Sequence, residues 1–151
     1  MHKITPFLWF NDNAEEAIQF YISVFKNSQL VSTMPGPNGK IMGASFVLDG
    51  QPFQALNGGP HFKFTEAISL FVSCETQEEI DEKWAKLTEG GQESRCGWLK
   101  DKFGLSWQII PPILSQLLAD KDREKANRVM QAMLQMNKID IKKLKDAAEQ
   151  K

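Results

Sequence analysis

The sequence is poor in the residues that most often bind metals or act as nucleophiles. It has two cysteines and two histidines in 151 residues. Cys74 and Cys96 lack the Cys-x-x-Cys spacing of zinc and redox sites, so we expect two reduced thiols, buried or on the surface, in a cytoplasmic protein. His61 stands alone in a Gly-Pro loop, where a histidine is more often exposed than catalytic. We find no Ser-His-Asp or Cys-His arrangement.

An excess of positive charge and a long apolar run are also missing. The formal net charge is −1, which argues against a nucleic-acid partner, because such a surface needs clustered lysine and arginine. No run approaches the roughly 18 apolar residues of a membrane span, and the first residues do not resemble a signal peptide. Hydrophobic residues make up 42% and charged residues 25%, as in an ordinary globular protein of one domain, with or without a tail.

A short sequence motif occurs twice in the chain. Residues 50–56 and 104–110 both read glycine, two variable residues, an aromatic residue, glutamine and two apolar residues. A similar helix-like segment precedes each motif, from Glu15 to Tyr21 and from Glu78 to Trp84. The repetition predicts a duplicated module, in which Gln54 and Gln108 are equivalent.

The apolar pattern predicts the order β-α-β-β-β in the first half. Ala14, Ala17, Ile18 and Tyr21 follow helical spacing, and Asn13 or Asp12 is the expected cap of that helix. A hairpin turn is predicted at residues 49–50. The expected strands are residues 4–10, 29–33, 41–48 and 52–57.

The second half repeats this order and then changes character. Thr76 and Glu79 predict a capping box, and Gly90 and Gly91 end that helix. Helices are expected at 113–119 and 122–136, and a last one begins after a hydrophobic staple at Ile139. The helix expected at 122–136 has a methionine-rich stripe, which is typical of packing against a core or a partner. The expected strands are residues 67–74, 93–96, 98–102 and 105–110.

Several segments of the chain together resemble one known family. They are residues 6–10, 14–17, 20–21, 55–60, 62–64, 66–69, 101–109, 125–126, 128–130 and 132–133. In these segments the chain resembles the PhnB-like family of the vicinal oxygen chelate superfamily, also labelled as a 3-demethylubiquinone-9 3-methyltransferase domain. The resemblance implies an α+β fold in which two β-α-β-β-β modules form a half-barrel cavity of the glyoxalase/bleomycin-resistance type. We expect a glyoxalase-like domain at 1–111, with modules of about 1–60 and 61–111, and a helical extension at 112–151.

The resemblance also implies where a metal would bind in metal-using relatives. The equivalent positions here are about Thr5, Gln54, Gln108 and either Ala67 or Glu66. Divalent metals favour imidazole and carboxylate ligands, and two neutral amides do not balance a 2+ charge. We therefore expect no metal and no cofactor.

The two glutamines are instead expected to face the cavity, because strand alternation separates each from its apolar neighbours. They either orient a small polar or aromatic ligand or bond to each other or to water. Glu66 is either a general base at the cavity mouth or paired with Lys63 or Arg95. The predicted cavity residues are Phe7, Trp9, Gln54, Trp98 and Gln108.

Three functions remain open from the sequence. The first is metal-free binding of a small molecule, and the second is a metal-dependent lyase, isomerase or transferase of the vicinal oxygen chelate type. The third is an interaction module, in which the helical tail mediates assembly. Methyl transfer finds no support, because no glycine-rich loop joins a strand to a helix in a parallel α/β pattern. The expected partners are a small molecule and a second copy of the chain, without nucleic acid or membrane.

Overall fold

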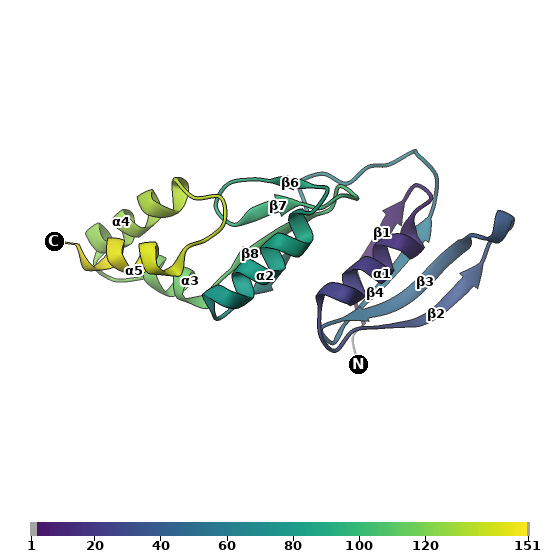
Figure 1. Cartoon of the computed structure of the whole chain (residues 1–151), viewed down its shortest axis with the longest axis horizontal. Helices are drawn as coiled ribbons and strands as arrows, with labels where there is room; N and C mark the ends of the chain where they lie inside the picture. The colour runs from purple at the N-terminus through teal and green to yellow at the C-terminus, as the bar shows by residue number, and fades with distance from the viewer. Residues whose placement is uncertain (1–2, 151) are drawn as a thin grey trace. The chain divides into compact units, whose positions relative to one another are not determined.

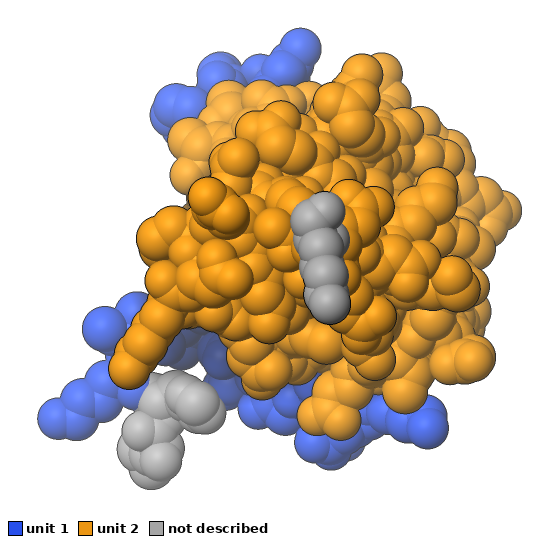
Figure 2. All heavy atoms as spheres, turned by 90° about the vertical axis from the view of Figure 1, so that its left-hand side faces the viewer, with its two compact units in different colours: residues 1–64 blue, residues 65–151 orange. Residues whose placement is uncertain are grey.

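The structure is a computed structural model that describes residues 3–150. The chain forms two compact units, residues 1–64 and residues 65–151, which are coloured separately in Figure 2. Each unit contains one four-stranded sheet with the order β-α-β-β-β along the chain (Figure 1). The predicted duplication of the module is therefore confirmed. Among residues 3–150, no helix has the length and apolar character needed to cross a bilayer.

The first unit is a mixed sheet with the strand order β1-β4-β3-β2. Strands β1 and β4 run parallel, and the other two neighbouring pairs are antiparallel. Asp49 and Gly50 join β3 to β4 and both have positive φ, 48° and 79°, which confirms the predicted hairpin turn. A short 3-10 turn covers Pro37–Gly39. The elements are β1 (Phe7–Phe10), α1 (Ala14–Val24), β2 (Gln29–Pro35), β3 (Ile41–Leu48) and β4 (Gln51–Asn57).

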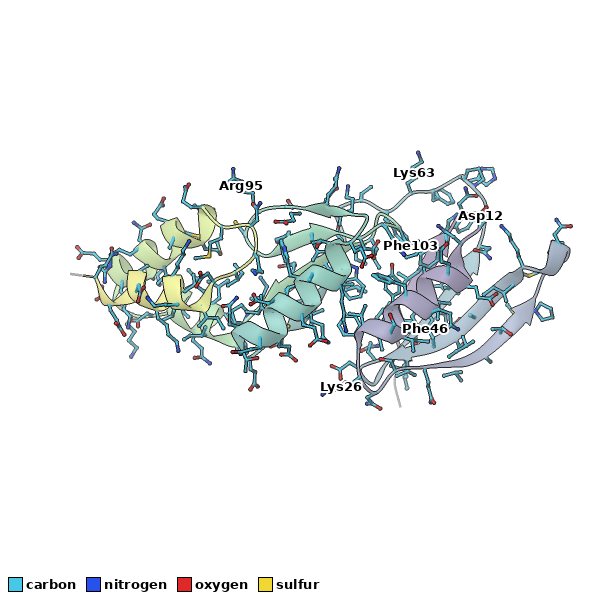
Figure 3. All side chains as sticks on the ribbon, in the orientation of Figure 1. Asp12, Lys26, Phe46, Lys63, Arg95 and Phe103 are labelled. Atoms are coloured by element: carbon cyan, nitrogen blue, oxygen red, sulfur yellow. The ribbon has the colours of Figure 1, made fainter. Side chains whose placement is uncertain are left out.

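Helix α1 packs on one face of this sheet. Its predicted apolar stripe is confirmed, since Ala17, Ile18 and Tyr21 are almost completely buried. Opposite them, the rings of Phe46 and Phe53 stack with centroids 5.3 Å apart, and Figure 3 shows Phe46 beneath the helix. Within residues 3–64, no helix covers the other face of the sheet (Figure 1).

The start of α1 differs from the sequence prediction. Asn13 occupies the capping position, but its side chain makes no capping hydrogen bond. The Ala14 backbone N–H instead donates to Asn57 Oδ1 at 2.9 Å, from the end of β4. The predicted local cap by Asn13 or Asp12 is therefore wrong, because a residue 43 positions away supplies the acceptor.

The second unit contains a smaller sheet with the strand order β5-β8-β7-β6. The capping box of its helix is confirmed, with Thr76 Oγ1 accepting from the Glu79 N–H at 3.1 Å. Strand β5 begins two residues later than predicted, so Glu66 and Ala67 lie in a turn before it. The elements are β5 (Ser69–Ser73), α2 (Gln77–Thr88), β6 (Gln92–Glu93), β7 (Trp98–Lys100) and β8 (Ser106–Ile110).

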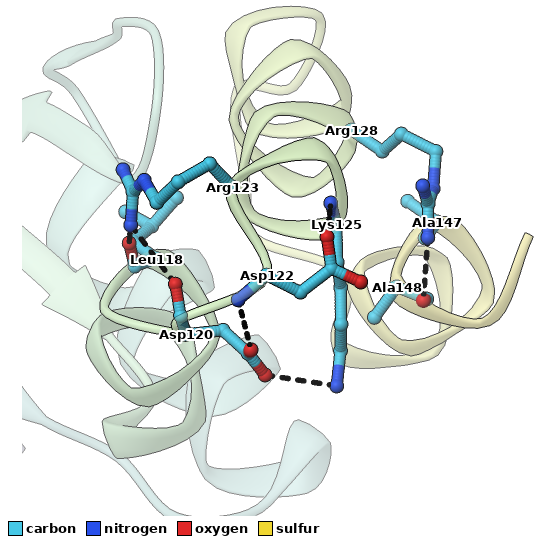
Figure 4. Close-up of polar contacts among 8 residues, drawn as sticks. All are labelled: Leu118, Asp120, Asp122, Arg123, Lys125, Arg128, Ala147 and Ala148. Atoms are coloured by element: carbon cyan, nitrogen blue, oxygen red, sulfur yellow. Dashed lines mark hydrogen bonds and ion pairs between the residues drawn. The ribbon is translucent and has the colours of Figure 1, made fainter.

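Three further helices belong to this unit: α3 (Pro112–Leu118), α4 (Arg123–Leu134) and α5 (Ile141–Glu149). They share an apolar core with the end of β8, and the predicted staple places Ile139 and Leu144 in that core. Arg128 ties α4 to α5 by donating to the carbonyls of Ala147 and Ala148 at 2.9 and 3.0 Å (Figure 4). The core residues are Ile110, Leu114, Val129, Met136, Ile139, Leu144 and Ala148.

Candidate functional site

The uncovered face of the first sheet carries a row of side chains, one from each strand. Phe53 and Ala55 are buried on the α1 side, so Gln54 points to the opposite face. Strand pairing then places Phe7 and Ser45 on either side of Gln54. Gln54 therefore lies on the face opposite α1, as strand alternation predicts, and its place in a cavity stays a prediction.

A depression of about 390 Å³ lies on this face. Its walls are largely apolar, and Phe7, Met34 and Met42 each expose more than half of their side-chain surface. Gly43 forms part of its floor, and a Cβ there would come within 3.1 Å of the Met34 side chain. The lining residues are Phe7, Ser32, Thr33, Met34, Met42, Gly43, Ala44, Ser45, Gln54, Ala55 and Leu56.

The Gln54 side chain is exposed and forms no hydrogen bond within residues 3–64 of its own unit. Its amide therefore presents a free donor and a free acceptor over the depression. Trp9 behaves differently, because its Nε1 donates to the Gly59 carbonyl at 2.9 Å and its ring meets Phe62 edge-on. Trp9 is absent from the lining of the depression, so the structure does not join it to the other predicted residues there.

The second sheet repeats this arrangement. Gln108 lies between Phe71 and Trp98 in the strand register, as Gln54 lies beside Phe7. Its Nε2 donates to Ser69 Oγ at 2.9 Å, so this amide already has a partner. The sequence analysis missed Phe71, which exposes 61% of its surface. The alternation of side chains along β5 could have identified Phe71, because residues 69 and 71 of a strand point to the same face.

The register also corrects one of the positions implied by metal-using relatives. Ser69 precedes Phe71 by two residues as Thr5 precedes Phe7, so Ser69 and not Ala67 is the equivalent of Thr5. Both are hydroxyl residues, which are poor ligands for a divalent metal. Among the described residues, no three His, Cys, Asp or Glu side chains gather closely enough to hold a metal ion.

Glu66 pairs with Lys100 of β7, and neither of the two predicted partners is correct. The side chains of Lys63 and Arg95 extend away from the ribbon in Figure 3. The hydrogen bond from Lys100 is the main cause that lowers the pKa of Glu66 from 4.5. A lower pKa makes this carboxylate a weaker proton acceptor, which is unfavourable for a general base.

Two other polar residues support the fold. Asp101 is buried in a turn, and its Oδ1 accepts from the Phe103 and Leu105 N–H groups at 2.8 and 3.1 Å. Its Oδ2 accepts from Trp107 Nε1 at 2.9 Å. Burial raises the pKa of the Cys74 thiol to about 12, so it stays protonated and unreactive at neutral pH. His61 is exposed in its loop, and His2 lies outside the described residues.

Known structures share this fold. A PhnB protein from Bacillus cereus, named as a putative 3-demethylubiquinone-9 3-methyltransferase, is 41% identical, with a TM-score of 0.69 over 73% of this chain and 99% of that one. A protein from Pseudomonas aeruginosa is 23% identical, with a TM-score of 0.64 over 74% and 98% of the two chains. A mutant of the fosfomycin resistance protein FosX from Listeria monocytogenes, solved with Mn(II) and a dihydroxypropylphosphonic acid, is 16% identical. Its TM-score is 0.58 over 77% and 98% of the two chains.

The last two similarities concern the fold alone. Among curated proteins, none matches this sequence. The family model for 3-demethylubiquinone-9 3-methyltransferase matches residues 2–110, which span both modules. The chain therefore belongs to this PhnB-like family, and its fold is that of the glyoxalase/bleomycin-resistance proteins of the vicinal oxygen chelate superfamily.

Proposed function

We propose that the protein binds a small molecule, without a metal, on the uncovered face of its first sheet. The ligand has an aromatic or apolar part and one polar group. The observation that carries this proposal is the Gln54 amide, which has no partner in its unit and stands at a largely apolar depression.

The chemistry of the depression favours such a ligand. Small-molecule sites are mostly apolar, with a few polar groups that orient the ligand, and they begin at about 300 Å³. Phe7, Met34 and Leu56 supply the apolar surface, and methionine adapts its shape to different ligands. Gln54 both donates and accepts, so it matches an amide or a similar group that does the same.

The second module supports the same proposal, because its sheet has a similar combination of side chains. Gln108 lies between Phe71 and Trp98, so this sheet also combines one amide with aromatic surface. We propose that Trp98 and Gln108 contact a ligand in the same manner. Because Gln108 is already held by Ser69, its amide is fixed in orientation, whereas the Gln54 amide is free to turn.

Binding without a metal follows from the side chains at the implied ligand positions. Thr5, Gln54, Ser69 and Gln108 offer two hydroxyls and two neutral amides, and none of them carries a negative charge. The family label suggests methyl transfer, but each sheet has only one parallel strand pair. This topology differs from a parallel α/β sheet with a glycine-rich strand-to-helix loop.

A titration with benzamide, which combines a ring and an amide, tests the proposal. We expect saturable shifts in the ¹⁵N NMR signals of β3 and β4. Replacing Gln54 with alanine removes about two hydrogen bonds and is expected to weaken binding roughly tenfold. Gln29→Ala is the matched control, because Gln29 is an exposed glutamine of the same sheet outside the depression, and it should leave the affinity unchanged.

Two results would contradict the proposal. One is benzamide binding that is equally strong in the wild type and in Gln54→Ala, or absent from both. The other is a stoichiometric metal that survives a chelator in the wild type and is lost in Gln54→Ala. That second result would favour a metal-dependent activity.

A further inference from the structure

Ser106 is an unusual residue at the start of β8. Only 1% of its surface is exposed, and its hydroxyl has no hydrogen-bond partner among the described residues. A buried hydroxyl without a partner is unfavourable, and such groups are uncommon in folded proteins. Its position therefore indicates that something outside the described chain completes its bonding.

The surroundings of Ser106 contain a charged pair. Lys100 lies directly opposite Ser106 in the β7–β8 register, so both side chains project from the same face of the sheet. Lys100 pairs with Glu66 from the turn before β5. Lys100, Glu66, Ser106 and Trp98 all line one small pocket of about 110 Å³, which lies entirely in the second unit.

We propose that Lys100 and Ser106 form a binding site for a small carboxylate, and that the Glu66 carboxylate occupies the Lys100 end of it in the unliganded protein. An incoming carboxylate displaces Glu66, accepts a hydrogen bond from Ser106 Oγ and takes over the pairing with the Lys100 ammonium.

Size and charge both favour a carboxylate. The pocket of about 110 Å³ has room for about four waters at roughly 30 Å³ each, so it can hold a carboxylate as small as acetate. The lining carries one ammonium, Lys100, and two carboxylates, Glu66 and Glu93, so a singly charged anion suits the pocket better than a phosphate dianion. The Glu66 pairing shows that Lys100 accepts a carboxylate as partner.

Glu66 is also placed to leave. Its side chain is 63% exposed on a turn, so it rotates into water without disturbing the core. An exposed ion pair contributes little to stability, so replacing the Glu66–Lys100 pair with a ligand costs little free energy. The residues that line this pocket differ from those that line the depression at Gln54. Carboxylate binding here is therefore a property beyond the function proposed above.

Acetate titrations followed by ¹⁵N NMR test this site, with sodium chloride at equal ionic strength as the reference. We expect acetate to shift signals of β7 and β8 saturably. Replacing Glu66 with glutamine is expected to tighten binding roughly tenfold, if Glu66 occupies the site about nine-tenths of the time. Adding Ser106→Ala to that variant should weaken binding about fivefold, and Lys100→Met should abolish it.

The controls separate this site from general charge effects. Asp146→Asn breaks the exposed Lys142–Asp146 pair and should create no acetate site at Lys142. Ser106→Ala removes only an unpartnered hydroxyl, so it should fold with a melting temperature no lower than that of the wild type. Gln54→Ala should leave acetate binding unchanged, so the two proposals fail independently.

The proposal is wrong if acetate acts no differently from chloride, or if Glu66→Gln does not tighten acetate binding. Tighter binding of inorganic phosphate than of acetate in the Glu66→Gln variant would overturn the carboxylate class. Equal acetate affinity with and without Ser106→Ala would remove Ser106 from the site.

Discussion

Asn57, at the residue scale, joins two elements that are distant in the sequence. Its Oδ1 accepts from the Ala14 N–H at the start of α1, and its Nδ2 donates to the Ile41 carbonyl at 2.9 Å. Both groups of the amide are therefore used. Asn57 replaces the local cap that Asn13 was expected to provide, because a strand end brings it over the first turn of the helix.

This arrangement leads to a prediction about two asparagines. Asn57→Ala is expected to lower the free energy of unfolding by about 1–2 kcal/mol, because it leaves a helix N–H without its acceptor. Asn13→Ala should cost much less, since the Asn13 side chain makes no capping bond. Urea unfolding followed by circular dichroism compares the two variants, and equal losses would contradict this assignment.

Single residues also show how far sequence reasoning reaches. Aspartate shortly before glycine is a local turn pattern, and Asp101 forms such a turn with Gly104, in which both the acceptor and the turn are local. The partner of Glu66 was not predicted correctly, because Lys100 is 34 positions away in the sequence. Long-range ion pairs depend on strand order, which the local pattern does not contain.

Strand β2 illustrates the limits of pattern at the scale of elements. All seven of its residues are exposed, and it lies at the edge of its sheet. Pro35 ends it, as is usual for proline in an edge strand. The sequence predicted the strand but not its place in the sheet, since a buried strand and an edge strand both favour β-branched and apolar residues.

Helix α5 shows the opposite case, in which the sequence predicted both the element and its packing. The Asp140 side chain caps it by accepting from the Lys143 N–H at 3.1 Å, and Leu144 is completely buried. The methionine-rich stripe also packs partly into this core, through Val129 and Met133 of α4 and through Met136, which follows the helix.

The contribution of this helix to stability is testable. Leu144→Ala is expected to lower the free energy of unfolding by about 2–4 kcal/mol, because it removes buried methyl groups and leaves a cavity. Lys145→Ala is the matched control on the exposed face of the same helix, and it should change stability by less than about 0.5 kcal/mol. Thermal unfolding measures both, and a Leu144→Ala loss no larger than the control would show that the tail does not share the core.

The whole molecule leaves large apolar side chains exposed in both units. Phe7 and Met34 in the first unit and Phe71 in the second each expose more than half of their surface. Apolar side chains gathered on a face without a helix are typical of binding or assembly surfaces. We therefore keep the proposal that the chain forms a homodimer.

Light scattering coupled to gel filtration tests this proposal. We expect a mass of about 34 kDa, which is twice the 17.1 kDa of the chain, over a hundredfold range of concentration. A mass that stays at 17.1 kDa throughout would contradict the homodimer. Benzamide should be included in a second run, because a ligand that covers Phe7 changes the exposed surface.

The sequence by itself determined the elements and the duplicated module, because helix stripes, capping residues and turn residues act over a few positions. It also determined that Gln54 and Gln108 are equivalent, since each stands at the same position of the repeated motif. Only the tertiary structure decided that Gln54 has no partner in its unit, that Ser69 holds Gln108, and that Lys100 holds Glu66. Those facts depend on which strands lie side by side, and strand pairing joins residues that the local pattern cannot relate.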